Sequence, residues 1–307
     1  MLHDRIGPYR ILDVLGRGGM GVVYVAQHDD GTQAAVKTVR IANESTLESI
    51  RREIQTLREL SHPGVVAIRD HGVTDGVPWY AMDLLRGSTL RDHLRSWFPD
   101  ATSSEDTTRD QQKVEATTTD LLRPARRAAE LALPASPANA PTYSIEHVAT
   151  LFRNICEPLA YVHGQGVVHR DLSPVNIFLV GADRPVLFDF GLAAQFRVDS
   201  ARDVLEIGGT LRGTAHYMAP EQARGEVVDA RADIYALGCM LYEALTGRPP
   251  FLGDSPVAVV MQHIDTPPIA PRAIVPSLPA ELEELVLRLL AKQPRMRLGY
   301  AQDVAAA

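Results

Sequence analysis

The sequence predicts an α+β fold with two unequal lobes, a small β-rich lobe followed by a larger α-helical lobe. Strand-like alternation of apolar residues occupies residues 9–39 and 65–85, whereas apolar residues recur mainly at helical spacing after Gly87. The length of 307 residues with 45% hydrophobic content suits two such lobes around a cleft. We therefore place the small lobe at residues 1–85 and the large lobe at residues 86–307.

The small lobe begins with strands over residues 9–39, where glycines interrupt a run of Val and Ile. Apolar residues at helical spacing predict a helix over residues 47–60, which ends at Ser61-His62-Pro63-Gly64. Strand character returns over residues 65–85, and Asp75-Gly76 predicts the turn of a hairpin within it.

The large lobe is predicted to contain helices over residues 145–163, 231–246, 256–263 and 280–292. Cys156 and Cys239 lie within helical apolar patterns, so we expect buried, reduced thiols rather than a disulfide or a metal pair. Residues 299–307 only begin a further helix, and we expect the chain to come from a longer protein.

A stretch from Ser96 to Thr142 is rich in Thr, Ser, Asp, Glu, Ala and Pro. Such a composition buries too little apolar surface to offset the entropy of ordering. We expect a disordered, solvated insertion over about residues 97–142, with a transient helix over 120–133. A docking or regulatory element is the alternative interpretation.

The overall charge and hydropathy exclude several classes of protein. A formal net charge of −7 gives no support for a nucleic-acid-binding surface. No apolar run reaches the roughly 18 residues of a membrane span, so no membrane segment is expected. The first five residues lack the apolar core of a signal peptide, and we expect a cytoplasmic protein.

The chemistry is concentrated in two motifs of the large lobe, His169-Arg170-Asp171-Leu172-Ser173-Pro174-Val175-Asn176 and Asp189-Phe190-Gly191. They supply a carboxylate, an amide and a second carboxylate in the order that phosphoryl transfer from Mg-ATP requires. Asn176 and Asp189 offer hard oxygen ligands for Mg2+. Asp171 is then available to orient an acceptor hydroxyl and to take its proton.

Two features of the small lobe fit the same chemistry. The glycine-rich loop from Gly16 to Gly21 lets backbone N–H groups approach phosphates, and the strand that continues after it argues against a dinucleotide-binding βαβ unit. Lys37 lies in an apolar strand and therefore needs a partner. Periodicity alone leaves Glu48, Glu53 and Glu59 as candidates for that partner.

Together these motifs, with Gly213–Glu221, resemble those of eukaryotic-like (Hanks-type) bacterial Ser/Thr protein kinases outside the insertion. The resemblance implies a two-lobed protein-kinase-like fold that transfers the γ-phosphate of ATP to protein Ser or Thr hydroxyls. It implies that Lys37 bridges the phosphates and a helical glutamate, and it selects Glu53. It also implies that Asp171 is the catalytic base and that Asn176 and Asp189 hold Mg2+.

The same resemblance implies a nucleotide site between the lobes. Met82 would be the gatekeeper, and Asp83 and Leu85 would offer backbone groups to adenine. Side chains of Val23, Ala35 and Phe178 would cover the faces of the base. The loop over the phosphates would consist of Gly16, Arg17, Gly18, Gly19, Met20 and Gly21.

Control of the activity is expected in the segment after Gly191. In the family, an arginine before the base, here Arg170, marks kinases switched by a phosphate in this segment. Thr210 is the predicted phosphosite, with Ser200 as a weaker candidate, and a homodimer is the arrangement considered for autophosphorylation. The resemblance further implies that Thr214 contacts Asp171 and the acceptor. It also implies that Glu221 pairs with Arg297 and that Asp233 braces the catalytic loop.

One departure from the family pattern is Ser173, where Ser/Thr kinases usually have a lysine that meets the γ-phosphate. Loss of that cation costs about 2–4 kcal/mol if nothing replaces it. A pseudokinase scaffold is therefore the alternative, although Lys37, Asp171, Asn176 and Asp189 are intact. A small-molecule phosphotransferase is a third alternative, which the Gly213–Glu221 segment disfavours.

Overall fold

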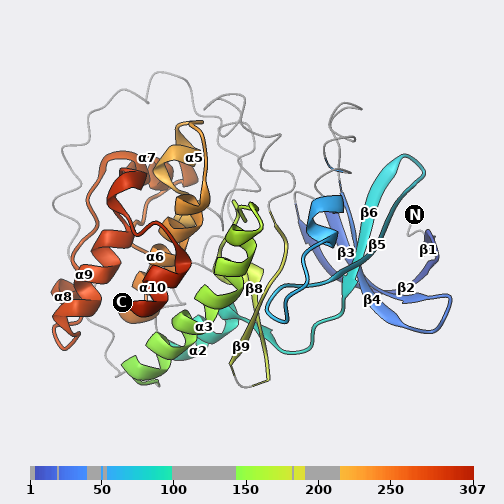
Figure 1. Ribbon diagram of the computed structural model, residues 1–307, viewed down its shortest axis with the longest axis horizontal. Helices are drawn as coiled ribbons and strands as arrows, with labels where there is room; N and C mark the ends of the chain where they lie inside the picture. The colour runs from blue at the N-terminus through green and yellow to red at the C-terminus, as the bar shows by residue number, and fades with distance from the viewer. Residues whose placement is uncertain are drawn as a thin grey trace.

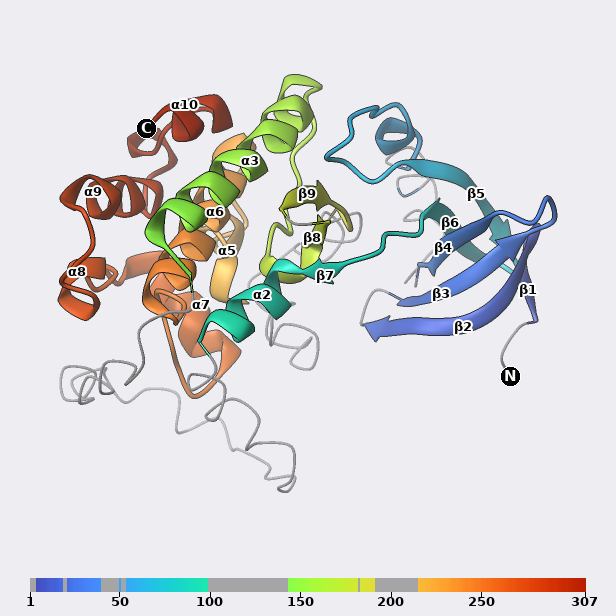
Figure 2. The ribbon, with the colours of Figure 1, turned by 90° about the horizontal axis from the view of Figure 1, so that it is seen from below.

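The computed structural model describes residues 4–18, 21–39, 50, 54–98, 143–181, 183–190 and 215–307. The small-lobe sheet lies at one end of the molecule and the helices of the large lobe lie at the other, with strands β8 (Ile177–Val180) and β9 (Arg184–Leu187) between them (Figure 1). The view from below shows the same arrangement, and β7 carries the chain from the sheet to the helices (Figure 2). The predicted two-lobed fold is confirmed.

Within this described part, the small lobe contains an antiparallel sheet with the strand order β1-β2-β3-β4-β6-β5. The predicted turn at Asp75-Gly76 joins its last hairpin, and both residues have positive φ, 51° and 78°. The strands are β1 (Arg5–Ile6), β2 (Tyr9–Gly18), β3 (Gly21–His28), β4 (Gln33–Thr38), β5 (Ile68–Thr74) and β6 (Val77–Asp83).

The alternation of side chains along β4 determines which of them reach the cleft. Val36 packs with Tyr9 and Trp79 in a cluster on one face of the sheet. Ala35 belongs instead to the main core that continues into the large lobe. Since successive side chains of a strand point to opposite faces, Lys37 shares the cleft face with Ala35.

Helix α6 (Ala230–Thr246) lies at the centre of the large lobe and is buried along nearly its whole length. Asp229 caps its N-terminus, and Gly247 ends it with a φ of 77°. The long helix α3 (Ile145–Gly164) crosses beside it, capped by Ser144 (Figure 2). After α2 (Leu90–Trp97), the other helices that the structure describes in this lobe are α5 (Pro220–Ala223), α7 (Pro256–Asp265), α8 (Pro271–Ile274), α9 (Ala280–Leu289) and α10 (Ala301–Ala306), with 3-10 turns η4 (Pro174–Asn176), η6 (Ala215–Tyr217) and η7 (Pro294–Met296).

A small antiparallel sheet in the order β7-β8-β9 connects the lobes and frames the chemistry-bearing segments. Its strands are β7 (Ser88–Thr89), β8 (Ile177–Val180) and β9 (Arg184–Leu187). Gly87 enters it with a φ of 151°, and a Cβ there would lie 2.1 Å from the carbonyl oxygen of Leu179. Only glycine fits so close an approach.

Helix α2 (Leu90–Trp97) ends where the insertion is expected to begin, at about residue 97. Both Trp97 and Phe98 are buried. Their rings lie 4.5 Å and 5.6 Å from the ring of Tyr143, so aromatic packing joins the two edges of the stretch. The remainder of the predicted insertion lies outside the described residues.

Cys156 and Cys239 are free and buried, as predicted. Among the residues that the structure describes, no helix combines the length and apolar character needed to cross a membrane.

Candidate active site between the lobes

The carboxylate of Asp233, on helix α6, holds the loop that carries Asp171. Asp233 accepts hydrogen bonds from the backbone N–H groups of His169 and Arg170, at 2.8 and 2.9 Å. His163, at the end of α3, donates a third bond to it at 2.8 Å. Arg170 has a φ of 64°, a conformation that a non-glycine residue keeps only where its surroundings hold it.

Asn176 and Asp171, predicted as metal ligand and base, lie side by side. The Asn176 amide nitrogen donates to the backbone oxygen of Asp171 at 2.7 Å and to its carboxylate at 3.2 Å. Since the amide nitrogen faces Asp171, the amide oxygen of Asn176 points away from it. That oxygen is the atom that a hard cation would use.

Lys37 reaches across the cleft and forms an ion pair with Asp189, which follows β9 in the large lobe. Lys37 is 6% exposed. Burial alone would lower the pKa of its amine, but Tyr80 and the carboxylates of Asp189 and Asp171 raise that pKa above its ordinary value. The amine therefore stays charged in its contact with Asp189.

His169 supports the segment that carries Asp189. Its ring stacks on the ring of Phe190 with 4.5 Å between centroids, and its Nε2 donates to the carbonyl oxygen of Phe188 at 3.1 Å. Burial lowers the pKa of His169, so its ring is neutral. His169 thus has a structural role beneath the segment that carries Asp189. Asp189 itself has a φ of 57°.

The glycine-rich loop forms the end of the β2–β3 hairpin, where Gly16 pairs with Val23 and Gly18 pairs with Gly21. Gly21 has a φ of 148°, and a Cβ on it would lie 1.8 Å from the carbonyl oxygen of Thr38. A side chain at this position would displace β4, the strand that carries Lys37. Arg17 lies on the same hairpin and is exposed.

Several of the residues predicted to contact adenine lie where β4 meets β6. Met82 is buried opposite Ala35 in the strand register, and the partly buried Val23 packs against the same core. The N–H of Asp83 donates to the carbonyl oxygen of Ala67 at 3.1 Å, so this N–H is not offered to a nucleotide. Phe178 is half-buried on β8, with its ring 6.1 Å from that of Phe188.

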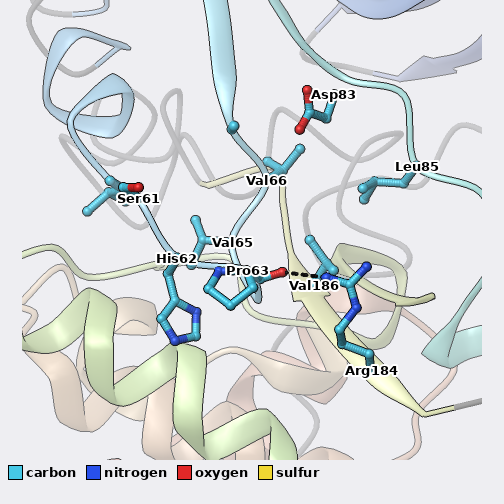
Figure 3. Close-up of a pocket in the computed structure, with 11 residues that line it drawn as sticks. Ser61, His62, Pro63, Val65, Val66, Asp83, Leu85, Arg184 and Val186 are labelled. Carbon is cyan, nitrogen blue, oxygen red and sulfur yellow. Dashed lines mark hydrogen bonds between the residues drawn. The ribbon is translucent and has the colours of Figure 1, made fainter. Parts of the chain in front are cut away.

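A pocket of about 350 Å³ lies beside the segment from Asp83 to Leu85, which leads from the small lobe to the large lobe (Figure 3). Side chains of Asp83 and Leu85 line it, and the Arg184 guanidinium donates to the carbonyl oxygen of Pro63 at its edge, at 3.2 Å. Lys37 and Asp171 take no part in its lining. The pocket is therefore separate from the cleft that holds the predicted catalytic groups.

A network of three polar residues in the large lobe was not anticipated from the sequence. The Tyr217 hydroxyl, on η6, accepts a hydrogen bond from Arg91 of α2 at 2.8 Å and donates one to Glu243 of α6. The Arg91 Nη1 also lies 3.6 Å from Oε1 of Glu243, which makes these two residues an ion pair. These residues are far apart in the sequence, and no local pattern marks them. In addition, Gln222 donates to the carbonyl oxygen of Arg170 at 2.7 Å.

Several predicted site residues lie outside the described residues. They are Gly19, Met20, Glu53, Thr210 and Thr214. The structure thus brings Lys37, Asp171, Asn176 and Asp189 together. The predicted pairing of Lys37 with Glu53 stays a prediction.

Comparison with known proteins gives a consistent result. A family described as "Protein kinase domain" matches residues 9–123 and 129–306. A probable serine/threonine-protein kinase of Streptomyces coelicolor, SCO3848, is 36% identical over 97% of this chain and 39% of its own length. The serine/threonine-protein kinase PknB of Mycobacterium tuberculosis is 34% identical over 99% of this chain and 42% of its own.

The chain thus spans about two fifths of the length of these curated relatives. Among solved structures, the kinase domain of M. tuberculosis PknI superposes with a TM-score of 0.67. It is 26% identical, and the match covers 100% of this chain and 97% of that one.

Proposed function

Because the chain belongs to the protein kinase family, we propose that it is a Ser/Thr protein kinase that transfers the γ-phosphate of ATP to hydroxyl groups of proteins. One observation carries the proposal. The Lys37–Asp189 ion pair lies in the cleft together with the hydrogen-bonded pair of Asn176 and Asp171. The names of the relatives, all serine/threonine-protein kinases, support the choice of acceptor.

The donor set at this site fits Mg2+. This ion prefers oxygen ligands and binds to one or two protein groups, completing its shell with phosphates and water. The outward amide oxygen of Asn176 and the carboxylate of Asp189 are two such groups. Among the described residues, no cluster of three or more His, Cys, Asp or Glu offers a site of another kind.

We assign the steps of the reaction to side chains of this chain. Lys37 would hold the α- and β-phosphates while its contact with Asp189 keeps the lobes in register. Mg2+, held by Asn176 and Asp189, would neutralise charge on the phosphates. Asp171 would orient the acceptor hydroxyl and take its proton as the oxygen attacks the γ-phosphorus.

Adenine recognition is assigned to the connection between the lobes. Met82, Val23, Ala35 and Phe178 supply apolar surface near it. Because the N–H of Asp83 is bonded to Ala67, we assign adenine contacts to the carbonyl of Asp83 and the backbone of Leu85.

Regulation is proposed from the sequence and the conformation of Arg170. The Asp233 carboxylate accepts the N–H of Arg170 and holds its backbone in place, so the point from which the Arg170 side chain extends is fixed. We propose that Thr210 is autophosphorylated and that Arg170 then binds the phosphate, with two copies of the chain pairing for this step. We further propose that Glu53 pairs with Lys37 and that Thr214 contacts the acceptor.

Incubation with radiolabelled ATP and Mg2+ tests the proposed activity. Wild type should label itself or an added protein, and Asp171→Asn should reduce the rate by about 10²–10⁴-fold, the usual contribution of a general base. Asp254→Asn, an exposed carboxylate outside the cleft, serves as the matched control and should keep the wild-type rate. Equal labelling by wild type and Asp171→Asn would refute the proposal, and phosphosite mapping of the product tests Thr210.

A further inference from the structure

The side chain of Thr38, the residue after Lys37 on β4, binds the strand that leaves the glycine-rich loop. Its Oγ1 accepts the N–H of Val22 at 3.1 Å and donates to the carbonyl oxygen of Val22 at 3.2 Å. A hydroxyl group is able to donate and accept at the same time. One side chain therefore binds both backbone polar groups of the residue that follows Gly21.

These two bonds extend the pairing of β3 with β4 by one step. The register of the two strands ends with Val23 opposite Lys37. In an antiparallel ladder, a hydrogen-bonded pair exchanges two N–H···O bonds through the main chain. At the next step, between Val22 and Thr38, the hydroxyl of Thr38 makes both bonds instead. The attachment of the loop to β4 at this point thus depends on a side chain.

The main chain of Thr38 also packs closely on the loop. A Cβ on Gly21 would lie 1.8 Å from the carbonyl oxygen of Thr38. Gly21 is buried, and its φ of 148° is one that glycine adopts readily. Thr38 therefore holds two successive residues at the end of the loop, Gly21 by close backbone packing and Val22 by hydrogen bonds.

The strand register places the Thr38 side chain away from the cleft. Lys37 is opposite Tyr80, and Tyr80 belongs to the main core. Thr38 is opposite Trp79, which packs with Val36 in the cluster on the other face of the sheet. Since successive side chains of a strand point to opposite faces, the Thr38 hydroxyl acts on a nucleotide only through the backbone of the loop.

We propose that Thr38 is a positioning residue that holds the glycine-rich loop where its backbone N–H groups meet the phosphates of ATP, a role that rests on the proposed kinase function. Lys37 and Thr38 are neighbours on β4, so the amine and the loop are both placed by the same strand. Without the hydroxyl, part of the binding energy of ATP is used to bring the loop into position, and the affinity falls.

Thr38→Val tests this role because it removes the hydroxyl and keeps the branched shape of the side chain. The KM for ATP should rise at least about fivefold, the factor that corresponds to the smallest usual contribution of two hydrogen bonds. The kcat should change less than the KM, because saturating ATP returns the loop to its position. Thr38→Ser retains the hydroxyl and should keep the KM close to the wild-type value.

Calorimetry supplies a readout that does not depend on turnover. The probes are adenosine, which has no phosphates, and the non-hydrolysable ATP analogue AMP-PNP with Mg2+. The affinity of Thr38→Val for adenosine should equal that of wild type, whereas its affinity for AMP-PNP should fall by at least about fivefold. A general loss of structure in the small lobe would weaken both ligands alike.

Thr74→Val is the matched control, because Thr74 also makes two hydrogen bonds in the small lobe. Its Oγ1 accepts the N–H of Gly7 at 3.2 Å and the indole N–H of Trp79 at 2.9 Å. Thr74 lies on the edge strand β5, two strands away from Thr38. Its replacement should lower the Tm by about 2–4 °C and leave both affinities at the wild-type values.

The outcomes separate this role from others. Equal affinity of Thr38→Val and wild type for AMP-PNP would overturn the proposal, as would a parallel loss of affinity for adenosine or an equal loss in Thr74→Val. Failure of Thr38→Ser to restore the affinity would also overturn it. A wild-type protein with no more turnover than Asp171→Asn would instead refute the proposed kinase function, and the calorimetric comparison would still report on Thr38.

Discussion

Arg297 and Glu221 form a two-point ion pair in the interior of the large lobe, with Nη1–Oε1 at 2.6 Å and Nη2–Oε2 at 2.8 Å. Both side chains are almost wholly enclosed, at 0% and 2% exposed. Arg297 also donates to the carbonyl oxygens of Arg231 and Ala291, at 2.8 Å each. The pair therefore ties α5 to the start of α6 and to the segment before η7.

Glu221→Gln should lower the free energy of unfolding by about 3–5 kcal/mol, because it leaves the Arg297 charge buried without its counterion. Urea denaturation measures the change. Glu226→Gln is the control, since Glu226 is 55% exposed and 4.0 Å from Arg224. It should change stability by less than about 0.5 kcal/mol. Equal small changes in both variants would show that the buried pair contributes little.

Lys37→Arg should reduce kcat/KM by at least about 10²-fold although the positive charge is retained. The ammonium of Lys37 lies in a buried position against Asp189, and a planar guanidinium does not reproduce the geometry of a compact amine. Steady-state kinetics with varied ATP measures the loss. A variant with wild-type kcat/KM would show that this contact does not position the phosphates.

Asp233→Asn should lower both the stability and the activity. The carboxylate accepts bonds from two backbone N–H groups and from His163, and an amide group turns a donor towards one of them. Hydrogen bonds to charged groups contribute about 1.5–3 kcal/mol each. We therefore expect a loss of more than about 1.5 kcal/mol in urea denaturation and a lower kcat. Unchanged kcat in the folded variant would show that the loop keeps its conformation without this brace.

His263 should make the fold sensitive to acid. Burial, with Lys292 and His216 nearby, lowers the pKa of His263 to about 3, and Tyr235 is hydrogen-bonded to its Nδ1. The unfolded chain binds a proton near pH 6.5 and the folded chain does not, so the contribution to stability is complete above that pH. It falls as the pH drops from 6.5 towards 3.

The expected loss between pH 6.5 and pH 5 is about 2 kcal/mol from this residue. His263→Gln should flatten the dependence of the unfolding free energy on pH by that amount, as measured by urea denaturation at several pH values. The contribution of His169, whose pKa burial also lowers, would remain. An unchanged slope in His263→Gln would show that the imidazole protonates readily in the fold.

Local patterns predicted much of the fold because they report directly on periodicity and turns. Asp75-Gly76 marked its hairpin, and the helical spacing of apolar residues marked α3 and α6. Helix α2 escaped prediction because it has only eight residues and its stability depends on contacts of Trp97 with Tyr143, across the compositionally biased stretch. The end of α9 at Leu289 was also placed three residues too late, at Lys292.

In the candidate site, too, residues in short motifs were predictable and contacts between distant parts of the chain were not. Motifs in short runs identified Asp171, Asn176 and Asp189, and the fold brings them to one cleft. The Arg91–Tyr217–Glu243 network and the bond from Gln222 to Arg170 join positions far apart along the chain. Such contacts follow from packing, and a single sequence does not reveal them. The hydrogen bonds of the Thr38 hydroxyl to Val22 likewise became visible only in three dimensions.

The short stretch from Gly64 to Val66, before β5, is hydrogen-bonded to Leu187 at the end of β9. The N–H of Val66 donates to the carbonyl of Leu187 at 2.9 Å, and the N–H of Leu187 donates to the carbonyl of Gly64 at 2.8 Å. Main-chain bonds of this kind tie the small lobe directly to β9, so a closure of the lobes would be a rotation about this edge. Asp189 follows Leu187 by only two residues, so the same edge also keeps the large-lobe partner of Lys37 close to the small lobe.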